Sequence, residues 1–341
     1  LAQKTSGQRR PGAASLDLAY VACGRYDEVI PACSETMHAG IRNSQLQIFE
    51  NLFKKPDKAA ESYEKILSIN ERHEPSLKQL ERLYRAQKQW PELVDTYRRH
   101  IMAAADPVDR MNLYALMGEV YENEIKDLDR AIESYSDILS VDPNHQNALI
   151  ALGRLYEKVE DWSRAIDTLS HLVSLVQDRR QQVELHTRIG GLYEDKLQDQ
   201  ETAEGRFLEA LRVDPNYVPA MHKLIALYKG RGDWLKASQL MIRAEEQLPN
   251  PLEKVKMLYE IGTIFRERLD DEQKGAEFLA RVIALDPEHV GAAEPLSDVY
   301  FAQQKWKELE PILDMLVRKA DRRDTKELNQ LYYRLARTAD Q

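Results

Sequence analysis

The sequence predicts an all-α chain built from a repeating pair of helical hairpins, and two observations carry this prediction. The four tryptophans, Trp90, Trp162, Trp234 and Trp306, follow one another at a constant spacing of 72 residues. The composition, 43% hydrophobic and 31% charged, is rich in the helix formers Ala, Leu, Glu, Lys and Arg. A period of this length predicts one elongated array rather than several separate globular domains.

The chain before the repeat divides into two short segments. Residues 1–12 are polar and contain Gly and Pro, which predicts a flexible lead-in. Residues 13–42 predict a helical lead-in, interpreted either as a degenerate hairpin or as a remnant of another domain. Because the chain begins at Leu1 and ends within a repeat, we expect it to be a piece of a longer protein.

The second interpretation rests on residues 9–27, which resemble a late segment of inositol monophosphatase-like enzymes. The matching residues are Arg9, Arg10, Gly12, Ala13, Ala14, Leu16, Asp17, Leu18, Ala19, Tyr20, Val21, Ala22, Gly24, Arg25 and Asp27. In that family a substrate-contacting Glu and a Trp-Asp metal motif follow, whereas Val29, Ile30 and Pro31 follow here. The catalytic chemistry of the family is therefore not carried over.

From about residue 43 each 72-residue unit contains two hairpins with recurring landmarks. One reads Tyr114-x2-Met117-Gly118-x2-Tyr121, then Ala131-x3-Tyr135, then Pro143. The next unit repeats this as Ile189-Gly190-x2-Tyr193, Ala203-x3-Phe207 and Pro215, and the third as Ile261-Gly262-x2-Phe265, Gly275-x3-Leu279 and Pro287. The pattern resembles the tetratricopeptide repeat, TPR. This resemblance implies a right-handed superhelical solenoid of TPR-like helix-turn-helix hairpins, with eight hairpins over residues 43–323 and the first helix of a truncated ninth over 324–341.

Each landmark has an expected structural role. Gly or Ala at the small positions lets the two helices of a hairpin approach within about 8 to 10 Å. The aromatic positions fill the space between neighbouring hairpins. The Asp-Pro pairs at 142–143, 214–215 and 286–287 are expected to end one hairpin and to place Pro in the first turn of the next helix.

Charge and hydropathy disfavour several classes of function. The net charge of −9 disfavours nucleic-acid binding, which needs clustered Lys and Arg. No uncharged run approaches the roughly 18 to 20 residues that span a bilayer, and no signal peptide is visible, so we expect no membrane insertion and a cytoplasmic location. Cys23 and Cys33 are expected to be reduced packing residues.

Two periodic or motif-like features have simpler structural interpretations. His73, His145 and His289 occupy equivalent positions, but one unit separates them by roughly 20 Å, too far for shared zinc coordination, so packing or capping is expected. The tripeptide Arg231-Gly232-Asp233 stands where the other units have a turn, and turn chemistry explains it.

No catalytic pattern emerges from the sequence. A Gly-rich phosphate loop, HExxH and GxSxG are all missing, and Asp106-Pro107-Val108-Asp109 is expected to be an inter-helix loop. We therefore predict no catalytic residues, no metal site and no cofactor, and we predict that the chain is not an enzyme.

The resemblance implies that the first helix of each hairpin lines a concave surface and that its outward positions contact a ligand. The positions counted from the Leu-Gly landmarks alternate in charge from hairpin to hairpin. They are Lys78, Arg82, Arg85, Glu119, Glu122, Asn123, Arg154, Glu157, Lys158, Glu184, Thr187, Glu194, Asp195, His222, Lys229, Tyr259, Thr263 and Arg266.

The predicted function is a protein-protein interaction scaffold that holds an extended or helical segment of a protein or peptide partner in this groove. One alternative is a regulatory or assembly region attached to an inositol monophosphatase-like domain that is mostly absent from this chain. A further alternative is a structural spacer or a self-association module, which makes a homo-oligomer possible.

Overall fold

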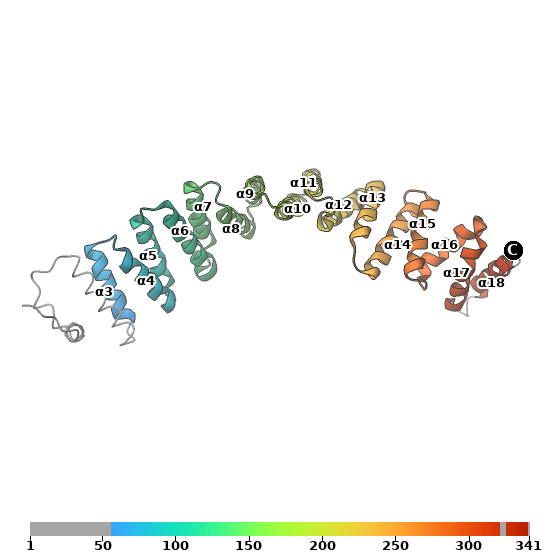
Figure 1. The fold of residues 1–341 in the computed structure, drawn as a ribbon, viewed down its shortest axis with the longest axis horizontal. Helices are drawn as coiled ribbons and strands as arrows, with labels where there is room; N and C mark the ends of the chain where they lie inside the picture. The colour runs from blue at the N-terminus through green and yellow to red at the C-terminus, as the bar shows by residue number, and fades with distance from the viewer. Residues whose placement is uncertain (1–55, 321–324, 340–341) are drawn as a thin grey trace, which may run out of the picture. The chain divides into compact units, whose positions relative to one another are not determined.

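The structure is a computed structural model that describes residues 56–320 and 325–339, apart from the side chains at 325–328 and at 339 (Figure 1). The described chain divides into two compact units, one up to Thr168 and one from Leu169, and each is described by itself. The expected lead-in segments, the phosphatase-like residues 9–27 and both cysteines lie outside the described residues.

The first unit consists of helices joined by short loops, and its last helix continues into the second unit. In chain order these elements are α3 (Pro56–Ile69), α4 (Glu74–Gln87), α5 (Trp90–Ala103), α6 (Pro107–Val120), the single π-helical turn η1 (Tyr121–Ile125), α7 (Leu128–Val141), α8 (Gln146–Lys158) and α9 (Trp162–Leu175). The turn η1 extends α6 directly, so both belong to one continuous helical rod.

The second unit continues the same alternation of helix and short loop. Its elements are α10 (Arg179–Asp195), α11 (Gln200–Val213), α12 (Val218–Arg231), α13 (Trp234–Gln247), α14 (Pro251–Glu267), α15 (Glu272–Leu285), α16 (Val290–Ala302), α17 (Trp306–Lys319) and α18 (Thr325–Ala339). The described residues of both units contain no strand.

Helix contacts follow the order of the chain. Within each unit the main helix-helix contacts join consecutive helices, for example α10 with α11 and α11 with α12 (Figure 1). A chain in which each element packs mainly on its neighbours is a linear array of repeats. The prediction of an all-α array of helix-turn-helix hairpins is confirmed.

The recurring landmarks occupy equivalent places in the described hairpins. Each of the four tryptophans is the first residue of a second helix, and each is half-buried. Small residues stand where a first helix meets a second: a Cβ built on Gly118 would lie 2.8 Å from the ring of Tyr135. Real Cβ atoms do not approach other atoms so closely, so the glycine is what allows the aromatic ring to pack there.

The loops are stabilised by helix caps that recur with the repeat. Nδ1 of His145 accepts a hydrogen bond from the backbone N–H of Ala148 at 3.2 Å, and His73 and His289 cap α4 and α16 in the same way. The expected capping role of these histidines is confirmed. The expectation for the Asp-Pro pairs is wrong in one respect: Pro143, for example, lies in the turn before α8 rather than in its first turn, because His145 is the N-cap.

Among the described residues, seven turn positions adopt a left-handed backbone, and they fall into two series with the period of the repeat. Between the helices of a hairpin, Lys88, Glu160, Gly232 and Gln304 form one series, and Lys126, Gln198 and Asp270 form the other. The φ angles lie between 54° and 76°, a region that costs an L-residue roughly 1 to 2 kcal/mol and glycine almost nothing. Glycine occupies this position at Gly232 alone among the seven.

Replacing Glu160 by glycine is therefore expected to stabilise the protein. Glu160 is exposed, with φ of 60°, and relief of its backbone strain should raise the free energy of unfolding by about 0.5 to 1 kcal/mol. The matched control is Gly232→Ala, which should lower it by about 1 kcal/mol. Urea unfolding of the three proteins measures both effects, and a destabilised Glu160→Gly variant would contradict this account.

Candidate partner-binding face

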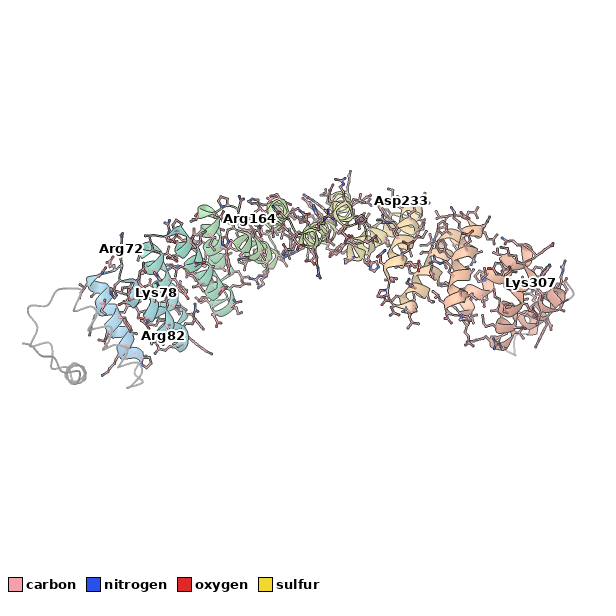
Figure 2. The ribbon with its side chains drawn as sticks, in the orientation of Figure 1. Arg72, Lys78, Arg82, Arg164, Asp233 and Lys307 are labelled. Carbon is pink, nitrogen blue, oxygen red and sulfur yellow. The ribbon has the colours of Figure 1, made fainter. Side chains whose placement is uncertain are left out.

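The residues that the sequence analysis assigned to partner binding lie on the first helices of the hairpins, α4, α6 with η1, α8, α10, α12 and α14. We refer to the exposed side chains of these helices as the first-helix face. Figure 2 labels Lys78 and Arg82, which lie one turn apart on α4 and are exposed. Of the eighteen assigned residues, ten are exposed, seven are half-buried and one, Glu122, is buried.

Glu122 departs from the expectation that it faces solvent. Its side chain is only 2% exposed, and it lies in η1 against α8. Nη2 of Arg154 lies 2.5 Å from Oε2 of Glu122, and Nζ of Lys158 lies 2.6 Å from Oε1. Since burying an unpaired carboxylate costs several kcal/mol, these two cations are needed to hold the first helices of adjacent hairpins together.

The second unit contains ion pairs of the same kind between first helices. Nζ of Lys223 on α12 reaches Glu194 at 2.9 Å and Asp195 at 3.4 Å, both on α10. The hydrogen bond to Glu194 is the main cause that raises the pKa of Lys223 above its ordinary value. Lys229, also on α12, pairs with Glu260 on α14.

These ion pairs explain why the charges alternate from hairpin to hairpin. Neighbouring first helices carry opposite charges that bind each other, so part of the alternation serves the stability of the array rather than a ligand. Sequence reasoning did not select Lys223 or Glu260, although both take part in these pairs. Their signal in the sequence was an opposite charge about thirty residues away on the next first helix.

Several other assigned residues make local contacts. Arg85 donates to the hydroxyl of Tyr97 on α5, and the hydroxyl of Thr263 donates to the backbone oxygen of Tyr259 at 2.9 Å. The ring of Tyr259 lies 4.8 Å from the ring of His289, which links α14 to the cap of α16.

The remaining assigned residues pair mainly within their own helices. The hydroxyl of Thr187 donates to the backbone oxygen of Val183 at 2.7 Å, and Glu184 pairs with Arg180 at 3.3 Å. Glu157 is half-buried on α8, and Arg266 packs its methylene groups beside Gly275 on α15.

Three assigned residues are exposed and make no ion pair or hydrogen bond with another described residue. They are Glu119 on α6, Asn123 in η1 and His222 on α12. A ligand can reach these side chains without breaking a bond within the array.

The other sequence features also have defined places in the structure. Arg231 ends α12, Gly232 is its left-handed C-cap, and Asp233, labelled in Figure 2, precedes α13. Arg231 pairs with Glu204, so this tripeptide forms an ordinary inter-helix turn. Asp106 caps α6, as expected of a turn residue, but the expectation that 106–109 form an inter-helix loop is wrong for the other three residues, because α6 begins at Pro107.

The described residues form neither a metal-binding cluster nor a membrane-spanning helix. Across 56–320 and 325–339, no group of three or more His, Cys, Asp or Glu side chains is arranged to hold a metal ion. No helix in the same ranges combines the length and the apolar character that crossing a bilayer requires.

Comparisons with known proteins agree with this architecture. Two tetratricopeptide-repeat family models match residues 76–110 and 125–189. The general transcriptional corepressor ssn6 of Schizosaccharomyces pombe is 28% identical over 167 residues, which are 48% of this chain. The match spans only 14% of the length of that protein.

Two solved structures that match this chain share little sequence with it. The structure of Naa15/Naa10 bound to HypK-THB is 16% identical, with a TM-score of 0.48, and the match covers 89% of this chain and 51% of that one. The C-terminal part of a TPR repeat-containing protein from Cytophaga hutchinsonii is 14% identical, with a TM-score of 0.44, 74% of this chain and 99% of that one being covered. The matched segments of this chain, with the helical hairpins that the structure places there, are tetratricopeptide repeats.

Proposed function

We propose that this chain is a protein-protein interaction scaffold that binds a segment of a partner protein along the first-helix face. The observation that carries the proposal is a set of exposed side chains on first helices that the described residues do not use for ion pairs: Glu119 and Asn123 on α6 and η1 in the first unit, and His222 on α12 in the second. The similarity of residues 76–110 and 125–189 to tetratricopeptide repeats supports a binding role.

The relative from Schizosaccharomyces pombe favours the same class of function. Its name describes a transcriptional corepressor. A corepressor acts together with other proteins, so a scaffold that binds proteins is consistent with this similarity.

The proposal predicts that changes on the first-helix face weaken partner capture without unfolding the chain. The test variant is Glu119→Arg with Asn123→Arg, which places two like charges about one turn apart on α6 and η1. A partner isolated with the wild-type chain should bind this variant at least about tenfold more weakly, a loss of roughly 1.4 kcal/mol. Binding is measured by titration with the purified partner.

The matched control is Glu133→Arg on α7, an exposed residue of a second helix. It should leave partner affinity within about twofold, a change below roughly 0.5 kcal/mol. Circular dichroism should be the same for all three proteins. Equal loss of affinity in the control, or no loss in the test variant, would remove the first-helix face from the proposal.

A further inference from the structure

A small pocket of the first unit lies among α3, α4 and α5. Its volume is about 330 Å³, and it is lined by Glu64 of α3, Tyr84 of α4, and Pro91, Glu92 and Asp95 of α5. We call it the Tyr84 pocket. Tyr84 has counterparts at the end of each second hairpin's first helix, namely Tyr156, Tyr228 and Tyr300, which allows the four sites to be compared directly.

In the other three hairpins a cation of the same chain lies over the equivalent tyrosine ring. The guanidinium carbon of Arg164, labelled in Figure 2, lies 4.9 Å from the ring centre of Tyr156. Nζ of Lys236 lies 5.1 Å from that of Tyr228, and Nζ of Lys305 lies 5.4 Å from that of Tyr300. At such distances a cation is attracted by the electron-rich face of the ring.

Two of these cations are held in place by an aspartate at the start of the second helix. Nε of Arg164 lies 2.6 Å from Asp161, and Nζ of Lys236 lies 3.1 Å from Asp233. The combination of an aromatic ring, a cation and a carboxylate is thus a recurring feature of this position in the repeat. It is a built arrangement rather than an isolated contact.

The Tyr84 pocket has the ring and the carboxylates but lacks the cation. The residue equivalent to Arg164 and Lys236 is Glu92. The fourth unit also has a carboxylate there, Glu308, but takes its cation from Lys305, whose equivalent in the first unit is the neutral Gln89. None of the described residues places a cation over the ring of Tyr84. Glu64 is paired with Arg99 at 2.8 Å, whereas Glu92 and Asp95 form no ion pair within 56–320 and 325–339. The charge at the place of the internal cation is therefore reversed.

From this comparison we propose that the Tyr84 pocket binds an arginine or lysine side chain of a partner polypeptide. The incoming cation would lie against the face of Tyr84, with Glu92 and Asp95 as counter-ions, and so complete the arrangement that the other hairpins build from their own residues. Burial together with Glu64 raises the pKa of Tyr84 to about 12, so the phenol stays neutral and the ring presents no charge of its own at physiological pH. This site is distinct from the first-helix face and does not depend on it.

The test uses a short fluorescein-labelled peptide of alternating glycine and arginine, and the same peptide with citrulline in place of arginine. Citrulline keeps the size of the side chain and removes the charge. Anisotropy titrations of the whole chain should show tighter binding of the arginine peptide. Tyr84→Leu should weaken the affinity for the arginine peptide by about 2- to 30-fold, the range of a cation-π contact. Tyr84→Phe keeps the aromatic ring and should retain this affinity.

Charge variants separate the pocket from the general acidity of the chain. Glu92→Arg places a cation where Arg164 and Lys236 stand and should abolish binding, whereas Glu133→Arg makes the same change of net charge elsewhere and should preserve it. Equal loss in both charge variants, or equal binding of the citrulline peptide, would overturn the proposal. Because Glu119→Arg with Asn123→Arg leaves the pocket intact, failure of the first-helix proposal would be seen separately.

Discussion

Replacing Arg154 and Lys158 together by methionine is expected to lower the free energy of unfolding by about 3 kcal/mol. Both cations bind the carboxylate of Glu122, which is 2% exposed. Without them the carboxylate lies in a buried place with no counter-ion, which is unfavourable. Because Arg154 and Lys158 are themselves about half exposed, we expect the lower end of the range measured for buried ion pairs.

Urea unfolding followed by circular dichroism measures this loss, and hydrogen exchange in α6 and α8 shows where it occurs. Adding Glu122→Gln to the double variant should recover most of the stability, since a neutral amide is far less costly to bury. The matched control is Arg180→Met, whose partner Glu184 is 53% exposed, and it should change the stability by less than about 0.5 kcal/mol. A double variant no less stable than this control would show that Glu122 does not need its cations.

The fold could be predicted from the sequence because the residues that determine it recur in every unit. The spacing of Trp90, Trp162, Trp234 and Trp306 fixes the length of the unit, and small residues such as Gly118 and Gly190 mark the close helix contacts. A position that makes the same packing contact in each unit carries a similar residue type in each unit. The hairpin pairing and the histidine caps belong to this class, whereas the helix start after Asp142-Pro143 was placed too early.

The candidate site was less predictable because its contacts are not repeated. The residues equivalent to Arg154 and Lys158 in the next unit are Ala226 and Gly230, so the pairing with Glu122 has no counterpart in the period. Glu194, the equivalent of Glu122, receives its cation from Lys223 instead. Helical periodicity shows which side chains point away from the core of a hairpin. It does not show whether such a side chain faces solvent or the next first helix.

The Tyr84 pocket was missed for a related reason. Its signal lies in two positions of the repeat: three units carry a cation at one or the other of them, Arg164, Lys236 and Lys305, whereas the first unit has Glu92 and Gln89. This difference gains meaning only when the structure shows that the three cations lie over tyrosine rings. The fold follows from what the repeats share, whereas this site follows from a combination of residues in which the first unit differs from the others.

The second large effect is expected at the core of the second unit. Phe207 is fully buried on α11, and its ring packs where α10 carries Gly190. Phe207→Ala should lower the free energy of unfolding by about 3 to 5 kcal/mol, because it removes a large apolar side chain and leaves a cavity between two packed helices. Urea unfolding of the whole chain measures this loss.

The same contact predicts that the effect of Gly190→Ala on the free energy of unfolding depends on residue 207. It should be a loss with Phe207 present and a gain in the Phe207→Ala variant. A Cβ at Gly190 would lie 2.6 Å from the ring of Phe207, so Gly190→Ala alone should destabilise the protein by about 1 to 3 kcal/mol. In the Phe207→Ala background the methyl group enters the cavity and the helix gains propensity, so the same change should stabilise it by about 1 kcal/mol. Gly205→Ala is the control: no atom lies within 4 Å of its added Cβ, so its effect should be a gain of up to about 1 kcal/mol in both backgrounds. If Gly190→Ala lowered stability equally with and without Phe207, the close approach of α10 and α11 would have another cause than the fit of glycine to the aromatic ring.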